Sequence, residues 1–342
     1  MIDGYGRNID YVRISVTDRC NLRCVYCMPE EGVPLVSHDE ILTFDEILAL
    51  AKVFAGLGIR KIKLTGGEPL VRKGIVSLVR ALKQIPQIEQ VTITTNGVLL
   101  GKYMGQLADA GVDGINLSLD TLDPGLYEQI TRKREAEKVM DGFQKALEYP
   151  QIPLKINCVP IRWNAMKVPE KDWADSIFQR ISGQNLLEIA DLARKYKVHV
   201  RFIEMMPIGP GAQFQPAAED ELLLELKARY GEYQVCGEKL GNGPGHYYTF
   251  PGFQGKIGFI SAISHKFCDQ CNRIRLTSQG FLKTCLQYDV GVDLRVLLRS
   301  GADETQLSQA ICDGISRKPI GHCFGENIGS HGEKHMMAQI GG

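Results

Sequence analysis

The sequence lacks an excess of charge of either sign, because 40 Lys and Arg residues balance 40 Asp and Glu residues. A neutral chain has no global field to steer it to nucleic acid or to an acidic membrane surface. The sequence also lacks any run of roughly 18 apolar residues, the minimum for a membrane span. Asp10 and Arg13 interrupt its first apolar stretch. We therefore expect no nucleic-acid partner, no membrane span and no leader peptide, and we predict a cytoplasmic location.

Structural disulfides are not expected either, because they are rare in reducing compartments. The sequence nevertheless contains ten cysteines, and six of them form two tight groups, which indicates metal binding. The first group is Cys20, Cys24 and Cys27, and the second is Cys268, Cys271 and Cys285. The four scattered cysteines are interpreted as small buried or surface residues: Cys158, Cys236, Cys312 and Cys323.

The first two hundred residues alternate short β-branched runs with amphipathic helical stretches, which predicts a parallel sheet covered by helices. The expected strands are Tyr11–Val16, Lys61–Leu64, Val91–Thr94, Ile115–Leu119, Leu154–Val159 and His199–Ile203. The expected helices are one that begins at a capping box at Thr43, then Ile75–Ile85, Leu99–Ala110, Ala136–Tyr149 and part of Glu170–Tyr196. Six such units predict an incomplete (β/α)6 TIM-type barrel or an open doubly wound sheet.

Polar residues on one face of the expected strands favour the barrel. Arg13, Lys63, Thr94, Lys155 and Arg201 each alternate with apolar neighbours along their strands. A parallel sheet that is dry on both faces normally consists of continuous apolar runs, and a closed barrel fills its lumen with branched side chains. The alternation therefore predicts an open lumen with a polar and basic wall.

The sequence pattern changes after Pro207, where a stretch rich in Gly and Pro, Pro207–Pro216, predicts a linker. We expect a helix at Glu219–Tyr230, short strands near Tyr247–Phe250 and Lys256–Ile260, and a final helix near Glu304–Ile315. This organisation predicts two parts, a barrel at 1–206 and a C-terminal extension at 207–342 with the second cysteine group.

Three cysteines at the spacing of Cys20, Cys24 and Cys27 suit a [4Fe–4S] cluster with one iron left open. Structural zinc needs four protein ligands, and the nearest further candidate is His38. An open iron can be chelated by the amino and carboxylate groups of S-adenosylmethionine (SAM). The second group also has three cysteines, so it too can leave an iron open.

Arg13 to Pro29 resembles the signature of the radical SAM superfamily, and Gly66-Gly67-Glu68-Pro69 resembles its GGEP segment. Cys268-x2-Cys271-x13-Cys285, the following Asn272-Arg273-Ile274-Arg275 and the terminal Gly341-Gly342 resemble the GTP 3′,8-cyclase family of that superfamily. The resemblance spans about residues 11–342. It implies conversion of GTP to (8S)-3′,8-cyclo-7,8-dihydroguanosine 5′-triphosphate, the first step of molybdenum cofactor biosynthesis, with SAM and two [4Fe–4S] clusters as cofactors.

The resemblance also implies roles for individual residues. Cys20, Cys24 and Cys27 hold cluster 1, and Cys268, Cys271 and Cys285 hold cluster 2. SAM is bound by Tyr26, Gly67, Ser118 and Met206. GTP is bound by Arg13, Lys63, Thr94, Lys155, Arg201, Arg273 and Arg275, of which Arg273 and Arg275 are the catalytic candidates. Gly341 and Gly342 form a functional tail. The implied partners are a low-potential electron donor, a second copy in a homodimer, and the cyclic pyranopterin monophosphate synthase that takes the product.

Two features depart from the family pattern. Lys63 stands where we expect Arg, which keeps the charge but loses the bidentate fork. The segment 160–196 is longer than expected, and we interpret it as an insertion or a second short helix outside the lumen. Two other functions remain open: a radical SAM peptide maturase with an auxiliary cluster, and a zinc protein that binds nucleic acid. The basic strands and the neutral net charge argue against them, respectively.

Overall fold

We analysed a computed structural model of the chain, which describes all residues except 35, 163–183, 239, 325–331 and 342. Six parallel strands form the centre of a curved sheet in the order β1-β2-β3-β4-β5-β7. They are β1 (Tyr11–Ser15), β2 (Lys61–Thr65), β3 (Gln90–Thr95), β4 (Gly114–Ser118), β5 (Leu154–Cys158) and β7 (His199–Ile203). All six strands were predicted, and the incomplete barrel is confirmed.

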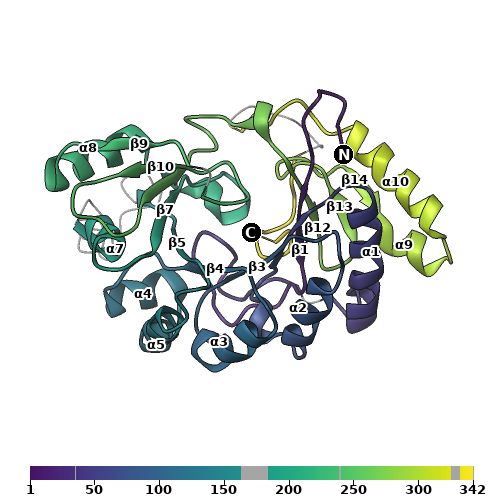
Figure 1. Cartoon of the computed structure of the whole chain (residues 1–342), viewed down its shortest axis with the longest axis horizontal. Helices are drawn as coiled ribbons and strands as arrows, with labels where there is room; N and C mark the ends of the chain where they lie inside the picture. Colours follow the sequence, from purple (N-terminus) through teal and green to yellow (C-terminus); the bar gives the residue numbers. More distant parts are fainter. Residues whose placement is uncertain (35, 163–183, 239, 325–331, 342) are drawn as a thin grey trace.

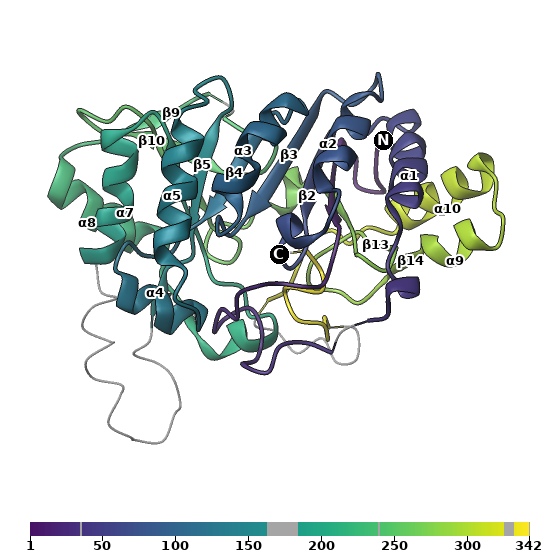
Figure 2. The same cartoon turned by 90° about the horizontal axis from the view of Figure 1, so that it is seen from below.

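Helices cover the outer face of this sheet (Figures 1 and 2). They are α1 (Phe44–Gly56), α2 (Ile75–Lys83), α3 (Leu100–Asp109), α4 (Pro124–Thr131), α5 (Ala136–Leu147) and α7 (Gln184–Lys195). The predicted capping box begins α1, because Thr43 Oγ1 accepts from Glu46 N at 3.1 Å and Glu46 Oε2 accepts from Thr43 N at 2.7 Å. The sequence analysis missed α4, which begins at the Asp123 cap and Pro124.

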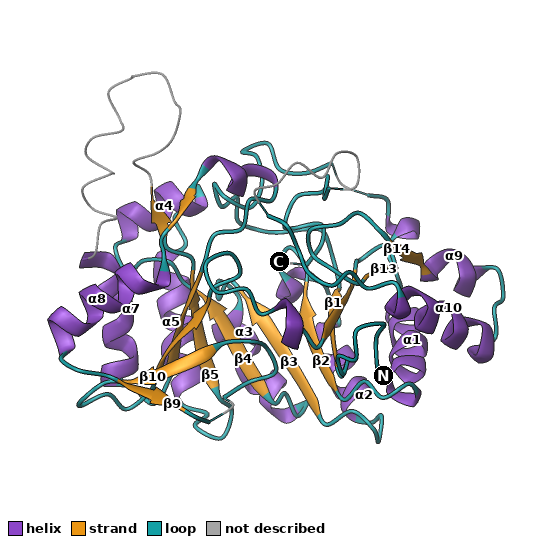
Figure 3. Cartoon of the chain, turned by 90° about the horizontal axis from the view of Figure 1, so that it is seen from above, coloured by secondary structure: helices purple, strands orange, loops and turns teal. Residues whose placement is uncertain are grey.

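The C-terminal part adds strands at both edges of the same sheet (Figure 3). At one edge, β12 (Arg273–Leu276) pairs in parallel with β1 and is followed by β13 (Phe281–Lys283) and β14 (Gly291–Asp293). At the other edge, β11 (Ile257–Ile260) pairs in parallel with β7 and is followed by β10 (His246–Thr249) and β9 (Gln234–Cys236). The extension therefore flanks the barrel, and the division at residue 206 stays a prediction.

The remaining elements lie in both parts of the chain. They are α8 (Glu219–Tyr230), α9 (Leu294–Arg299), α10 (Glu304–Ser316), the short pair β6 (Ile161–Arg162) and β8 (Gln215–Pro216), and four short 3-10 helices. The 3-10 helices are His38–Glu40, Pro69–Val71, Gly209–Gln213 and Cys268–Gln270. Much of the long 160–196 segment lies outside the described residues. None of the described helices is long and apolar enough to cross a membrane.

The strand register places the polar residues of the predicted wall opposite one another on neighbouring strands. Arg13 lies opposite Lys63, and Asn157 lies opposite Arg201. Apolar neighbours such as Val12 and Ile62 are fully buried. The end of the chain returns to this concave side, where the C-terminal marker in Figure 1 lies inside the curve of the sheet.

Candidate active site

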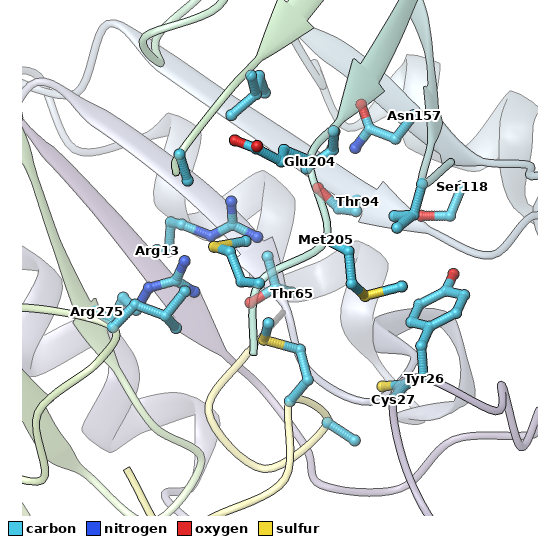
Figure 4. Close-up of a pocket in the computed structure, with 18 of the residues that line it drawn as sticks. Arg13, Tyr26, Cys27, Thr65, Thr94, Ser118, Asn157, Glu204, Met205 and Arg275 are labelled. Carbon is cyan, nitrogen blue, oxygen red and sulfur yellow. The ribbon is translucent and has the colours of Figure 1, made fainter. Parts of the chain in front are cut away.

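A cavity of about 300 Å³ occupies the concave side of the sheet. All six grouped cysteines line it, as do basic side chains from β1 and β12 and the C-terminal residues Met337 and Ala338. In the close-up of Figure 4, Arg13 and Arg275 lie on one side of the cavity and Tyr26, Cys27 and Ser118 on the other. The fold therefore brings together two cysteine groups that are separated by more than two hundred residues.

The first cysteine group lies in the loop after β1. The main-chain N–H of Cys27 donates to the carbonyl oxygen of Cys24 at 2.9 Å, and the N–H of Leu22 donates to Cys20 Sγ at 3.4 Å. Burial raises the pKa of Cys20 to about 11 and that of Cys27 to about 12, and it also raises the pKa of Cys24. Charge on Cys27, Asp120 and Cys20 raises the pKa of Cys24 further, so the positive charge of a bound metal cluster would favour the thiolate forms of this group.

The second group combines Cys268 and Cys271, before β12, with Cys285, after β13. Burial raises the pKa of Cys271, but the positive charges of Lys318 and Arg273 outweigh it and bring this pKa down to about 7. Lys318 is buried, and its ammonium donates to the carbonyl oxygens of Arg273 and Thr284. These cations favour the thiolate form of Cys271, whereas burial raises the pKa of Cys285.

Neither cysteine group forms the compact trio of sulfur atoms that a single zinc ion needs. Cysteines around one tetrahedral zinc lie about 3.8 Å apart, as the Zn–S bond length requires. Among the described residues, one group of three His, Cys, Asp or Glu side chains has its ligand atoms within 4.8 Å of one another. It consists of Asp289, Glu333 and His335 and includes no cysteine. The buried ammonium of Lys283 already pairs with Glu333. Ligands of different irons lie further apart, so both cysteine groups suit four-iron clusters.

The four residues predicted to bind SAM line the cavity beside the first cysteine group: Tyr26, Gly67, Ser118 and Met206. A side chain at Gly67 would collide with the carbonyl groups of Arg19 and Asp18, so the close approach of two loops requires glycine here. The hydroxyl of Tyr26 donates to Asp120 Oδ2 at 2.7 Å.

The sequence analysis gave no individual role to two carboxylates of this region, Asp120 and the Glu68 of the Gly66–Pro69 segment. Asp120 accepts from Tyr26 and from the N–H of Val159 at 2.8 Å, and burial raises its pKa to about 6. Glu68 is buried and accepts from Thr95 Oγ1 at 2.8 Å and from Asn96 N at 2.7 Å, while burial raises its pKa to about 7. Asp120 lies two residues after the end of β4, at the carboxyl end of a barrel strand, a position that sequence reasoning could have used.

The residues predicted to bind GTP divide into two groups. Arg13, Thr94, Arg273 and Arg275 line the cavity itself. Lys63, Lys155 and Arg201 do not line the cavity, and Arg201 Nη2 donates to Asn116 Oδ1 at 2.6 Å and to Asn157 Oδ1 at 2.5 Å. Asn157 lines the cavity and accepts this hydrogen bond, so it connects the residues that line the cavity to Arg201.

The basic residues of the lumen lie close enough to repel one another. Burial lowers the pKa of Lys63 far below its usual value, and the positive charges of Arg201, Arg13, Lys155 and Arg273 lower it further. Burial and Arg201 lower the pKa of Lys155 to about 8. Such a cluster is costly unless an anion enters it.

The C-terminal tail enters the cavity beside these arginines. Ala338, Ile340 and Gly341 are buried, and the carbonyl oxygen of Gly341 accepts from Arg275 Nη1 at 2.6 Å. Arg13 Nη2 lies 3.4 Å from the same oxygen. Gly342 lies outside the described residues.

A partial (β/α)6 barrel with three cysteines after its first strand defines a radical SAM protein. The Radical SAM superfamily indeed matches residues 14–165, and a second family, Molybdenum Cofactor Synthesis C, matches residues 198–324. The chain is 41% identical over 343 residues to the GTP 3′,8-cyclase of Clostridium perfringens (strain SM101 / Type A), with all of both chains covered. It is 42% identical over 348 residues to that of Desulforamulus reducens, again with full coverage. The chain therefore belongs to the GTP 3′,8-cyclase family.

Solved structures with the same fold are more distant in sequence. SuiB from Streptococcus suis bound to S-adenosylmethionine has a TM-score of 0.56 and 17% identity, covering 91% of this chain and 68% of its own. SuiB bound to the precursor peptide SuiA has a TM-score of 0.56 and 15% identity, covering 92% of this chain and 66% of its own. At this identity the likeness concerns the fold alone.

Proposed function

We propose that this chain is a radical SAM enzyme that converts GTP to (8S)-3′,8-cyclo-7,8-dihydroguanosine 5′-triphosphate, the first step of molybdenum cofactor biosynthesis. The observation that carries the proposal is the single cavity lined by both cysteine groups and by arginines from β1 and β12. Full-length identity of 41% to a relative named GTP 3′,8-cyclase supports the same reaction.

The cofactors are SAM and two [4Fe–4S] clusters, and together they supply a low-potential electron and a carbon radical that removes hydrogen from the substrate. Cys20, Cys24 and Cys27 hold the first cluster, and Cys268, Cys271 and Cys285 hold the second. Tyr26, Gly67, Ser118 and Met206 position SAM. Asp120 holds the Tyr26 hydroxyl at 2.7 Å and fixes that side chain beside the first cluster.

The basic lumen binds the triphosphate. Arg13, Lys63, Thr94, Lys155, Arg201, Arg273 and Arg275 form this site. Buried cations that repel one another attract phosphate strongly, and arginine adds bidentate hydrogen bonds. Arg273 also packs over the ring of Phe267, with 5.0 Å between its guanidinium carbon and the ring centroid, and so has a fixed position beside the second cysteine group. Holding the base and sugar between the two cysteine groups brings the reacting carbons together.

We further propose that the chain acts in the cytoplasm, forms a homodimer and receives electrons from a low-potential donor. Its product passes to the cyclic pyranopterin monophosphate synthase. These assignments follow from the family resemblance.

Anaerobic incubation of the reconstituted protein with SAM, dithionite and GTP tests the proposal directly. We expect the cyclised nucleotide and 5′-deoxyadenosine in equal amounts, measured by liquid chromatography and mass spectrometry. Cleavage of SAM without any change to GTP would favour the alternative function, a peptide maturase.

A triple Arg273→Ala, Arg275→Ala, Lys155→Ala variant tests the basic site separately. Each charge-assisted contact contributes about 1.5–3 kcal/mol, so GTP binding should weaken at least tenfold with the iron content unchanged. Lys138→Ala is the matched control, because Lys138 makes an exposed ion pair with Glu135. Unaltered GTP binding in the triple variant would mean that the basic lumen serves another ligand.

A further inference from the structure

A glycine-rich segment that the sequence analysis did not single out, Gly241-Asn242-Gly243-Pro244-Gly245, lies beside two basic residues of the lumen. It lies between β9 and β10. The side-chain amide of Asn272 donates to the carbonyl oxygen of Asn242 at 3.1 Å and to Asp10 Oδ1 at 2.6 Å. Asp10 and Asn272 directly precede β1 and β12. The segment is thus tied to the amino ends of these two strands.

Two glycines of this segment lie against two cations of the lumen. A Cβ atom at Gly241 would lie 3.1 Å from Lys155 Nζ, and one at Gly243 would lie 3.8 Å from Arg273 Nη1. Neither glycine has a positive φ, so backbone conformation does not require glycine at these positions. A side chain at 241 would instead press on the ammonium group of Lys155, since the first distance is tighter than an ordinary van der Waals contact.

The charges around Lys155 explain why this proximity matters. Arg201 is the charge that lowers the pKa of Lys155 together with burial, and no carboxylate of the described residues forms an ion pair with Lys155. His199, at the start of β7, has its pKa lowered to about 4 by burial and by Lys155, Arg201 and Lys256. The inner end of the lumen is therefore a positive site whose wall on one side is uncharged backbone.

We propose that Gly241–Gly245 forms the terminal-phosphate end of the nucleotide site and makes it selective for a nucleoside triphosphate over the monophosphate. The segment sets the depth of the lumen and holds the Lys155 ammonium and the Arg273 guanidinium where the outermost phosphate arrives. The absence of a side chain at Gly241 leaves room for the ammonium in that position. This inference rests on the proposed function, because it assumes that GTP enters the lumen with its phosphates toward β5 and β12.

The position of the Cβ atom that a substitution at Gly241 would add suggests a specific test. A side chain at Gly241 meets only the far end of a flexible lysine, so it should move the ammonium at little cost to the fold. Gly237 lies in the same connection, and a Cβ atom there would have nothing within 4 Å. Gly237→Ala and Gly237→Val are therefore matched controls for Gly241→Ala and Gly241→Val.

Affinities for GTP and GMP are measured by anaerobic calorimetry on the reconstituted protein, without SAM or reductant so that no turnover occurs. We expect Gly241→Val to weaken GTP binding about tenfold and GMP binding less than twofold, with Gly241→Ala between this variant and the parent. The Gly237 variants should match the parent. In a Lys155→Ala background the effect of Gly241→Val on GTP binding should disappear, because the ammonium group that valine displaces is absent.

Equal losses for GTP and GMP, or the same loss in the Lys155→Ala background, would overturn the inference. Thermal unfolding of each variant shows whether the fold is intact, and Gly241→Ala remains informative if Gly241→Val unfolds. A parent protein that binds neither nucleotide would instead overturn the proposed function.

Discussion

Arg275 Nη1 donates a 2.6 Å hydrogen bond to the carbonyl oxygen of Gly341, and so joins β12 to the end of the chain. Arg275 is almost completely buried and is close to Arg13 and Arg273, which lower its pKa together with burial. The neutral carbonyl group of Gly341 compensates only part of the positive charge of Arg275. The tail therefore lies against the proposed substrate site while leaving cationic capacity for a phosphate or carboxylate.

Gly341→Ala should severely reduce GTP cyclisation. Gly341 has a φ of +74°, and a Cβ atom there would lie 2.7 Å from Thr65 Oγ1 and 3.2 Å from Ser15 Cβ. We expect at least a tenfold loss of kcat with unchanged iron content. Gly301→Ala is the matched control, because Gly301 has a similar φ of +86° but nothing within 4 Å of its added atom. Both variants carry backbone strain of about 1 kcal/mol, and only the first disturbs the site. Similar activity in both variants would contradict a role for the tail.

Deletion of Gly341 and Gly342 should abolish cyclisation while preserving iron content and the melting temperature. A short peptide with the native tail sequence, supplied in excess, should restore part of the activity. The expectation follows from the hydrogen bonds that the carbonyl oxygen of Gly341 accepts from Arg275 and Arg13, which the deletion removes. A truncated enzyme with full turnover would show that the tail is dispensable, as chain termini often are.

Anaerobic reconstitution should yield about eight irons per chain, as two four-iron clusters require. Replacement of Cys20, Cys24 and Cys27 by Ala should remove half of the iron and all SAM cleavage. Replacement of Cys268, Cys271 and Cys285 should remove the other half and leave SAM binding at the first group. Cys312→Ala should change neither count, because Cys312 is exposed on α10. Iron and zinc are measured by elemental analysis, and stoichiometric zinc without iron would refute both cluster assignments.

Local sequence patterns predicted the barrel and most of the site for identifiable reasons. Alternation with a period of two placed Arg13 and Lys63 on one face, and the register pairs them directly. Cysteine spacing singled out both cysteine groups, and the structure places all six of these cysteines around one cavity; their metal binding stays a prediction. Each of these signals operates within a short stretch of chain, where the physics of strands and ligand geometry is strongest.

Two of the three features that the sequence did not predict depend on contacts between residues that are distant in the sequence. The pairing of Tyr11 with Arg273 joins strands 262 positions apart, and no local pattern encodes it. The eight-residue helix α4 is too short for a clear periodic signal. Gly241 resembles a residue of any glycine-rich turn until Lys155 is seen beside it. Distance in sequence hid the strand pairing and the role of Gly241, and shortness hid α4.

His199 should make the stability of the protein sensitive to mild acid. Its pKa is lowered from 6.5 to about 4, first by burial and then by Lys155, Arg201 and Lys256. Its Nδ1 also accepts a 3.2 Å hydrogen bond from the N–H of Lys256, which protonation would remove. The unfolded chain therefore binds the proton more readily than the folded one. The stability associated with His199 is complete above pH 6.5 and is lost as the pH falls from 6.5 toward about 4.

His199→Asn should flatten this part of the pH dependence, because the Asn side-chain oxygen can accept from Lys256 without gaining a charge. Urea unfolding midpoints between about pH 7.5 and 5.5 provide the measurement, and the exposed His38→Asn variant is the control. Saturating GTP should reduce the loss in the parent, since phosphate beside Lys155 and Arg201 offsets the repulsion that disfavours imidazolium. If the parent and His199→Asn lose stability in parallel over this range, other groups carry the acid sensitivity. A loss that GTP leaves unchanged would place the phosphates away from β5 and β7.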